Sequence, residues 1–288
     1  MFVEFDLAGA EWVIVAYLAD DPNMIAIAKS GRSPHTATGA LISRAPEALV
    51  EREHKLLGSM TDPDGLLVMR RKLLPELFEG DYFVPRIFTI RQAGKKSNHG
   101  LNYDMRYRRF ALENEMPEKD AEAIVSLYHD SAYPGIRKTF HADIKHELRH
   151  NDRTLVNLMG RRVRLLDQAG PDLWDKAYAF KPQSTVFDIC RRAMVLAFND
   201  MDVLCGPMRL KAQVHDSILV SYPDEKRDQL VPFVHKMIDY MSPQLECKGH
   251  TFTLGVDVKC GPSWGEMAPL DLSEDVLEEW RPRREAAQ

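Results

Sequence analysis

Hydrophobic and polar residues alternate along the chain with two different periods, one typical of helices and one typical of strands. Residues 10–29 carry apolar positions at helical spacing and predict a helix with a break near Asp21-Pro22. Residues 208–222 instead form two alternating apolar runs that meet at His215-Asp216. This second pattern predicts a β-hairpin with its turn at those two residues.

The same patterns predict the other elements and the fold class. Helices are expected at about 35–57, 91–103, 118–130, 134–150, 184–199 and 224–241. Strands are expected at Phe2–Phe5, in a pair around Asn157–Leu166, and at 251–259. A chain that consists mostly of helices around a small antiparallel sheet is typical of the α+β class.

Composition describes an ordinary soluble globular protein, with 44% hydrophobic and 28% charged residues among 288. The apolar stretches are shorter than the ~18 to 20 residues that a membrane span needs, so no membrane contact is expected. Acidic residues stand near Met1 where an export signal would carry lysines. The cysteines form no CxxC pair, which predicts a reduced cytoplasmic protein without a structural zinc site; they are Cys190, Cys205, Cys247 and Cys260.

Charge is distributed unevenly, although the net charge is only −5. Residues 86–164 hold 16 Lys and Arg against 10 Asp and Glu, whereas the remainder holds 22 against 33. One interpretation is a basic face that binds a polyanion such as nucleic acid. The other is that helices carry uneven solvated faces, and composition alone favours this one.

Two aspartates stand where strands are expected to end. Asp6 follows the first strand, and Asp216 lies at the tip of the hairpin among residues expected to be buried. A carboxylate in such a place is costly unless a charge compensates it. Two of them could share divalent cations, with backbone oxygens and waters as further ligands. For Asp216 alone, a turn residue that bonds its own backbone is the commoner explanation.

Four residues recur at every fourth position: Arg91, Lys95, His99 and Tyr103. Each step advances about 400° around a helix, so they form one stripe that drifts by only ~40° per step. Such a stripe can bind a triphosphate through its cations and stack on a base or sugar through its rings. A solvated amphipathic face is equally compatible with the spacing.

Together these segments resemble motifs A, B and C of the family A DNA polymerases. Asp6 and Glu11 are similar to motif A, the stripe with Gly100 to motif B, and VHDS at 214–217 to motif C. His35 follows Asp6 by 29 residues, as that family's pattern expects. Other similar segments occur in the same order up to about residue 267: HTATGAL, AYPGI, GRR, QSTVFDICRRAM and GVDVKCGPSWGE.

The resemblance implies a DNA polymerase that adds dNTPs to a primer 3′-hydroxyl by two-metal phosphoryl transfer. Asp6 and Asp216 would hold two Mg²⁺ ions, which Mn²⁺ can replace, and Leu7 is a third ligand position. The residues implied to clamp the phosphates are Arg91, Lys95 and His35; those implied to line the base and sugar are Tyr103 and His99. Glu11 would exclude a 2′-hydroxyl and so favour deoxynucleotides.

The implied partners are dNTPs and primer–template DNA. Gln183 would read minor-groove acceptors and His215 would support the primer terminus. Arg106 and Arg109 would face backbone phosphates, although solvated surface is an equal alternative. Three residues depart from the family pattern: His99 replaces an aromatic residue, Asp104 a glycine, and Gly9 a glutamine.

The resemblance also divides the chain into parts. The palm is expected at residues 1–30 and 131–267, and the fingers at 31–130 with an insertion at about 45–88. Residues 268–288 form an acidic tail, interpreted as a surface or docking helix that Asp271 and Glu274 would cap.

The family's thumb and first palm segment would precede motif A, and here only five residues precede Asp6. The first strand is therefore expected to fray, the thumb to be absent, and a second polypeptide to supply it. A truncated reading frame is the competing explanation, and a phage origin is a further expectation. Two other functions stay open: a single-subunit RNA polymerase fragment, which Ser217 favours, and a palm–fingers subunit that is inert without its partner.

Overall fold

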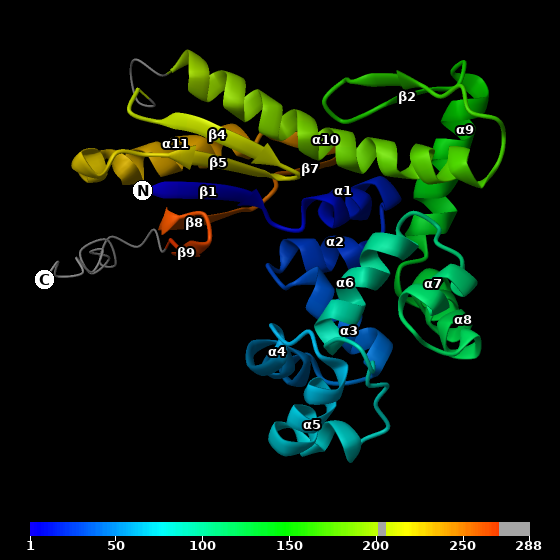
Figure 1. Cartoon of the computed structure of the whole chain (residues 1–288). Coiled ribbons are helices and arrows are strands. Elements are labelled where there is room, and N and C mark those ends of the chain that lie inside the picture. The colour runs from blue at the N-terminus through cyan, green and yellow to red at the C-terminus, as the bar shows by residue number, and fades with distance from the viewer. Residues whose placement is uncertain (201–205, 271–288) are drawn as a thin grey trace, which may run out of the picture. The chain divides into compact units, whose positions relative to one another are not determined.

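The structure is a computed structural model that describes residues 1–200 and 206–270 (Figure 1). The chain divides into two compact units. We call them the sheet unit (residues 1–10, 183–246 and 251–288) and the helical unit (residues 11–182 and 247–250). The expected α+β class is confirmed, since helices predominate and the sheets are small and antiparallel.

The sheet unit is built on a five-stranded antiparallel sheet with the strand order β4-β5-β1-β8-β9. Its strands are β1 (Phe2–Leu7), β4 (Arg209–Val214), β5 (Ser217–Ser221), β8 (Val256–Ser263) and β9 (Glu266–Pro269). The hairpin expected at His215-Asp216 is confirmed. The expected fraying of the first strand is wrong, because β1 is paired with β5 on one side and β8 on the other.

Alternation along β1 separates its two faces. Val3, Phe5 and Leu7 are fully buried, and the Phe5 ring meets Phe233 edge-to-face at 5.9 Å. Phe233 belongs to α11 (Leu230–Met241). Because successive side chains on a strand point to opposite faces, Asp6 lies on the other face. The buried face thus fixes the register that presents Asp6.

The remaining elements of this unit are short, apart from the long helix α10. They are the 3₁₀ turn Asp224–Gln229, the second part of α10 (Pro171–Asn199), and most of the ladder of β6 (Leu245–Cys247) with β7 (His250–Phe252), whose residues 247–250 are counted with the helical unit. The helix expected at 184–199 therefore begins earlier, at Pro171, and contains Pro182. Within the described residues, no helix is long and apolar enough to cross a membrane. Cys205, Asp271 and Glu274 lie outside the described residues.

The helical unit contains the expected helices with several changes in their bounds. Its helices are α1 (Ala10–Ala19), α2 (Pro22–Lys29), α3 (Pro34–Ser43), α4 (Glu47–Leu57), α5 (Pro63–Leu73), α6 (Ile90–Leu101), α7 (Tyr107–Glu113), α8 (Glu118–Ser126) and α9 (Ala142–His150). Shorter elements are the 3₁₀ turn Pro75–Phe78, the π-helical turns Leu127–Ala132 and Ile136–His141, and the β2 (Thr154–Val156) and β3 (Arg162–Arg164) pair.

Caps and prolines explain where these helices start. The expected break near Asp21-Pro22 is confirmed, because the Asp21 carboxylate accepts the amides of Asn23 and Met24 at the start of α2. The single helix expected at 35–57 is wrong. Arg44 adopts a left-handed φ of 63° after α3, and α4 begins anew beyond Pro46.

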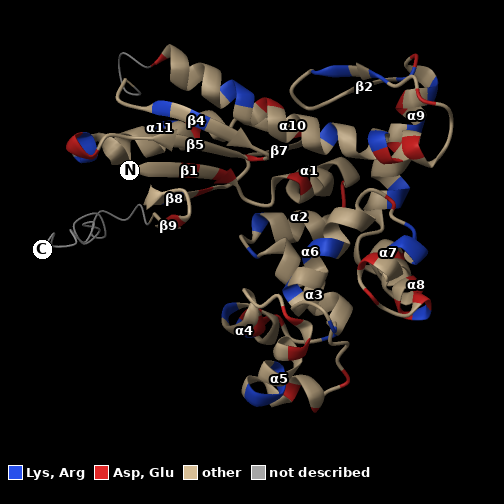
Figure 2. Ribbon diagram, viewed as in Figure 1, with Lys and Arg blue, Asp and Glu red and all other residues tan. Residues whose placement is uncertain are grey.

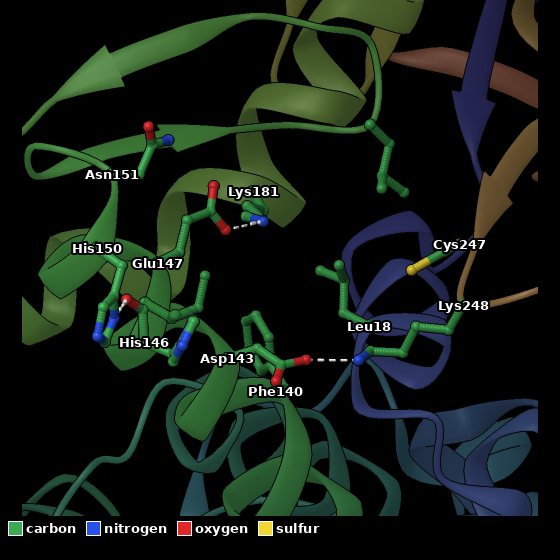
Figure 3. A pocket seen from close by; sticks show the side chains of 12 residues that line it. Leu18, Phe140, Asp143, His146, Glu147, His150, Asn151, Lys181, Cys247 and Lys248 are labelled. Atoms are coloured by element: carbon green, nitrogen blue, oxygen red, sulfur yellow. Dashed lines mark hydrogen bonds and ion pairs between the residues drawn. The ribbon is translucent and has the colours of Figure 1, made fainter.

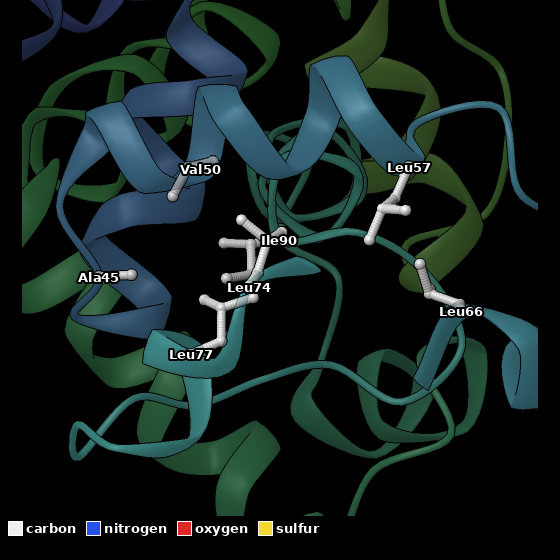
Figure 4. Packing of buried hydrophobic residues seen from close by; sticks show 7 residues of the cluster. All are labelled: Ala45, Val50, Leu57, Leu66, Leu74, Leu77 and Ile90. Atoms are coloured by element: carbon white, nitrogen blue, oxygen red, sulfur yellow. The ribbon is translucent and has the colours of Figure 1, made fainter. Parts of the chain in front are cut away.

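The segment expected as an insertion has a small core of its own (Figure 4). Its buried members are Ala45, Val50, Leu57, Leu66, Leu74 and Leu77, together with Ile90 at the start of α6. Charged side chains are buried beside this core, since Glu53 and Arg70 are 0% and 1% exposed and form an ion pair. The segment is thus an ordered subdomain rather than a loop.

Candidate active site

The sheet unit brings together the two aspartates predicted from the sequence. Asp6 stands near the end of β1, opposite Ser217 on β5 and Asp257 on β8. Asp216 lies in the hairpin turn directly before Ser217, and its carbonyl oxygen accepts the Leu7 amide at 3.1 Å. Neighbouring strands therefore hold the two carboxylate-bearing residues in adjacent register positions.

The electrostatics of Asp6 indicate uncompensated negative charge. Burial, and then the nearby carboxylate of Asp216, raise the pKa of Asp6 to about 6. Lys259 opposes this shift, but Glu4 and Asp257 add to it. Excess negative charge on hard oxygen donors suits a divalent cation such as Mg²⁺ or Mn²⁺.

The donor set here consists of two carboxylates. In the part of the chain that the structure describes, no group of three or more His, Cys, Asp and Glu side chains is arranged to hold a metal. The side chain of Leu7 is a hydrocarbon without donor atoms, so this residue can offer only its backbone oxygen. Cys190 also lies near both aspartates, but burial raises the pKa of its thiol to about 12, which keeps it protonated and a poor ligand.

The helical unit brings together the cations predicted to bind phosphate. The Thr89 hydroxyl caps α6, which carries Arg91 in its first turn and then Lys95 and His99. His35, in the first turn of α3, lies with its ring 5.9 Å from that of His99. Figure 2 shows Lys and Arg but no acidic residue on α6, whereas both signs occur on α7 and α8.

The pKa of His35 is strongly lowered by burial and by the positive charges around it. Burial, and then the positive charges of Arg91, His99 and Lys95, lower the pKa of His35 to about 3. Asn98 donates its amide to Nδ1 of the ring at 3.2 Å, so the neutral ring carries its proton on Nε2. The cluster therefore offers a neutral donor and several cations, which is the chemistry that an oligophosphate requires.

Two glycines allow α3 and α6 to cross closely at this cluster. A Cβ at Gly94 would lie 2.2 Å from the carbonyl oxygen of His35 and 2.5 Å from the amide nitrogen of Gly39. A Cβ at Gly39 would lie 2.7 Å from the carbonyl oxygen of Ile90. The crossing therefore requires glycine in both helices, because a Cβ on either would clash with the backbone of the other. It holds His35 against the helix that carries Arg91.

Tyr103 lies just beyond α6 rather than on it, which corrects the helix expected at 91–103. The helix ends at Leu101, and Asp104 adopts a φ of 63°. The Tyr103 hydroxyl donates to Oε2 of Glu11, in the first turn of α1, at 2.6 Å. Burial and this carboxylate raise the pKa of Tyr103 well above its usual value, so the phenol keeps its proton.

The residues predicted to contact DNA are exposed: Gln183, His215, Arg106 and Arg109. His215 adopts a φ of 53° in the hairpin turn. Arg109 forms an ion pair with Glu113 one turn along α7, and Asp104 pairs with Arg137. Their exposure leaves these side chains accessible to a ligand.

A separate pocket of ≈ 470 Å³ in the helical unit contains a motif that the elements above do not use (Figure 3). Residues 146–150 read HELRH, which matches the HExxH pattern of zinc peptidases. Glu147, however, accepts the amide of Val156 at 3.0 Å and the ammonium of Lys181 at 2.6 Å. Both oxygens of Glu147 are therefore already hydrogen-bonded, and among the described residues no group of three or more His, Cys, Asp and Glu side chains could hold a metal, so the match to the zinc motif is one of sequence alone.

Comparison with known proteins places this geometry in a family. Residues 88–266 match the sequence profile described as DNA polymerase family A, and the chain belongs to that family. It is 25% identical over 266 residues to DNA polymerase I of Deinococcus radiodurans. It is 23% identical over 273 residues to the thermostable DNA polymerase I of Thermus aquaticus.

These alignments cover 90% and 92% of this chain but 23% and 27% of those two relatives. The chain thus spans about a quarter of the length of these relatives. Its fold is similar to a solved structure described as the POL domain of Pol1 from M. smegmatis in complex with DNA primer-template and dNTP. That match has a TM-score of 0.67 and 19% identity, and it covers 91% of this chain and 40% of the other. The resemblance drawn from the motifs is therefore confirmed at the level of family and fold.

Proposed function

We propose that this chain is the catalytic region of a template-directed DNA polymerase that adds dNTPs to a primer 3′-hydroxyl. The observation that carries the proposal is the carboxylate pair Asp6 and Asp216, held in adjacent register positions with uncompensated charge. The cation cluster of the helical unit supports it, because a polymerase must also hold a triphosphate.

In this proposal Asp6 and Asp216 would hold two Mg²⁺ ions, for which Mn²⁺ can substitute, and the backbone oxygen of Leu7 would be a further ligand. When bound, one ion would lower the pKa of the primer 3′-hydroxyl and the other would offset charge on the leaving pyrophosphate. The two carboxylates keep the metal close to the primer end, and Asp6 must lose its proton to do so.

The cation cluster binds the nucleotide in the helical unit. Arg91 and Lys95 neutralise the triphosphate, and His35 donates from Nε2 to a phosphate oxygen. His99 and Tyr103 contact the sugar and base. Glu11, held by Tyr103, occupies the space that a 2′-hydroxyl would need.

The DNA contacts complete the assignment. Gln183 contacts the minor groove, His215 the primer terminus, and Arg106 with Arg109 the backbone phosphates. We keep the division into palm (1–30 and 131–267), fingers (31–130) and tail (268–288) as part of the proposal. A second polypeptide that supplies a thumb and further palm stays a prediction.

Primer extension by the purified chain tests the proposal. Labelled primer–template is incubated with Mg²⁺ and with dNTPs or rNTPs in parallel, and Asp216→Ala is compared with Asp239→Ala. Asp239 is exposed on α11, so its substitution is the matched control. Extension with dNTPs that only Asp216→Ala abolishes supports the proposal and makes a second polypeptide unnecessary.

Extension that prefers rNTPs would instead support the RNA polymerase alternative. If the chain extends no primer, binding of a fluorescent dNTP analogue still tests the nucleotide site. Binding that Arg91→Ala removes would then favour a subunit that needs a partner, whereas no binding at all would contradict the proposed site.

A further inference from the structure

The helix that carries Arg91 starts at a buried ion pair supplied by the inserted subdomain. Nε of Arg70 on α5 donates to Oε1 of Glu53 on α4 at 2.7 Å. Arg70 also donates to the carbonyl oxygens of Pro85 at 2.5 Å and Phe88 at 2.8 Å. One guanidinium thus joins two inserted helices to the segment that leads into α6.

Glu53 reaches α6 itself. Its second oxygen, Oε2, accepts the amide of Ile90 at 2.7 Å, and Ile90 is the first residue of α6. A carboxylate at this end also suits the helix dipole. The Ile90 side chain is fully buried in the core of the subdomain (Figure 4), so packing and hydrogen bonding act at the same residue.

Arg91 follows directly, and its charge acts on the same helix α4. The next residue of α4, His54, has its pKa lowered by burial and then by the charge of Arg91. Glu53 and His54 therefore flank the start of α6, one through the Ile90 amide and one near the Arg91 guanidinium. A shift of α4 would move the first cation of the nucleotide cluster.

A buried ion pair is an unusual way to gain stability alone, because desolvation offsets most of its attraction. Burial raises the pKa of Glu53, because the ionised carboxylate loses its contact with water. Arg70 and the Ile90 amide oppose that rise, because both stabilise the ionised form. Its directional contacts set the position of a backbone more narrowly than apolar packing does. The pair is therefore better explained by what it positions than by stability.

We infer that Glu53, held by Arg70, is a positioning residue that fixes the first turn of α6 and so directs Arg91 toward the nucleotide. The inference rests on the proposed function, because it needs Arg91 to bind the triphosphate. It gives the inserted subdomain a role in nucleotide affinity, although its ion pair would not touch the substrate.

Two double variants separate positioning from folding. Arg70→Met combined with Glu53→Gln removes both charges but keeps an oxygen that can accept the Ile90 amide. Arg70→Met combined with Glu53→Leu removes that acceptor as well. Apolar replacement of a buried ion pair is often tolerated, so both variants should fold. The control is Arg52→Met with Glu76→Gln, which removes an exposed ion pair of the same subdomain.

The readouts are the Kd for a fluorescent dATP analogue, the Kd for primer–template, and the thermal midpoint, all on the full chain. The Glu53→Leu double variant should bind the nucleotide about tenfold more weakly while DNA affinity holds, since small displacements of a binding group cost this much or more. The Glu53→Gln double variant should stay close to the parent, and the control should match it.

Unchanged nucleotide affinity in the folded Glu53→Leu double variant would overturn the inference, as would equal losses in both double variants. Arg91→Ala distinguishes a failure of the positioning role from a failure of the proposed nucleotide site. If it weakens nucleotide binding while the Glu53→Leu double variant does not, only the positioning role fails. If Arg91→Ala has no effect, the proposed nucleotide site fails and the inference fails with it.

Discussion

The Tyr103 hydroxyl donates a 2.6 Å hydrogen bond to Oε2 of Glu11, which lies 92 residues earlier in the chain. The phenol is partly buried and keeps its proton, and the carboxylate is the acceptor. Glu11 is therefore a fixed group rather than a mobile surface acid. A fixed carboxylate can exclude one hydroxyl of a sugar, whereas a mobile one would move aside.

Glu11→Ala should therefore relax the choice of sugar. We expect the ratio of rNTP to dNTP incorporation to rise by about 10²-fold, since removing a steric block acts on one substrate only. Tyr103→Phe should give a smaller rise, because it frees Glu11 without removing it. Single-nucleotide incorporation with matched dATP and ATP measures both effects. An unchanged ratio in Glu11→Ala would show that another residue selects the sugar.

Asp6→Asn should abolish extension yet stabilise the metal-free protein. The folded-state pKa of about 6 lies above the ordinary 3.8, so ionisation disfavours the folded state as pH rises from about 4 to 6. We expect the thermal midpoint at pH 7.5 in EDTA to rise by about 2 °C or more, with little gain at pH 4. Mg²⁺ should stabilise the parent and not the variant. A lower midpoint at pH 7.5 would contradict the charge argument.

Triphosphate binding should be accompanied by proton uptake at His35. Its pKa is about 3 without ligand, and phosphate charge must raise it. A group whose pKa rises on binding takes up protons at pH values between its free and its bound pKa, so affinity should increase as pH falls through the raised pKa and calorimetry near pH 5 should detect the uptake. Calorimetry with tripolyphosphate in buffers of different ionisation enthalpy measures the uptake. His35→Gln should lose it, while the exposed His146→Gln should not.

Gly94→Ala should disrupt the crossing of α3 and α6. Alanine gains about 1 kcal/mol in helix propensity, but its Cβ would overlap the carbonyl oxygen of His35. The steric overlap should outweigh the gain in helix propensity. We expect a net loss of about 1–3 kcal/mol in the free energy of unfolding, together with weaker nucleotide binding. Gly170→Ala is the control, since the nearest atom lies 4.0 Å from its Cβ. A stabilised Gly94→Ala would show that the helices can separate without cost.

His129→Leu should make the protein less sensitive to acid. His129 is 1% exposed, neither ring nitrogen has a hydrogen-bond partner among the described residues, and burial lowers its pKa to about 3. The unfolded chain takes up a proton near pH 6.5 and the folded chain does not, so stability falls as pH drops below that value. The variant should regain up to about 2 kcal/mol at pH 5. The exposed His150→Leu should regain none in the same denaturant titrations.

Alternation with period two was sufficient to predict β1 and the hairpin at His215-Asp216. One face of β1 is buried, so its apolar residues report the register directly, whereas β5 is buried along almost its whole length and β4 holds only exposed and half-buried residues. The break at Asp21-Pro22 was predictable for a local reason as well, because the cap and the proline act within one turn. Of these elements, β1 and the hairpin carry Asp6 and Asp216, so their prediction from the sequence also brought the two aspartates to adjacent strand ends.

Other features depend on contacts that no local pattern reveals. Pro182 marks a helix end by local rules, yet α10 continues through it. Glu53 and Arg70 are charged and predict surface positions, but each is buried by its partner and by the start of α6. The four-residue spacing alone predicts that the helix continues through Tyr103. The structure ends α6 at Leu101, and Tyr103 bonds Glu11 of another helix, a contact that spacing cannot reveal.

The central position of β1 has a consequence for how the protein is made. Phe2 pairs with Ser221 on one side and with Gly261 on the other, so this strand leaves the ribosome long before either of the two strands that flank it. At about 5–20 residues per second, the nascent chain waits on the order of ten seconds or more with this strand unpaired. An unpaired apolar strand is a site for wrong association. Asp6 and Asp216 can meet only after the hairpin of β4 and β5 has been made, so a nascent chain that ends before this hairpin lacks the pair that the proposed reaction requires.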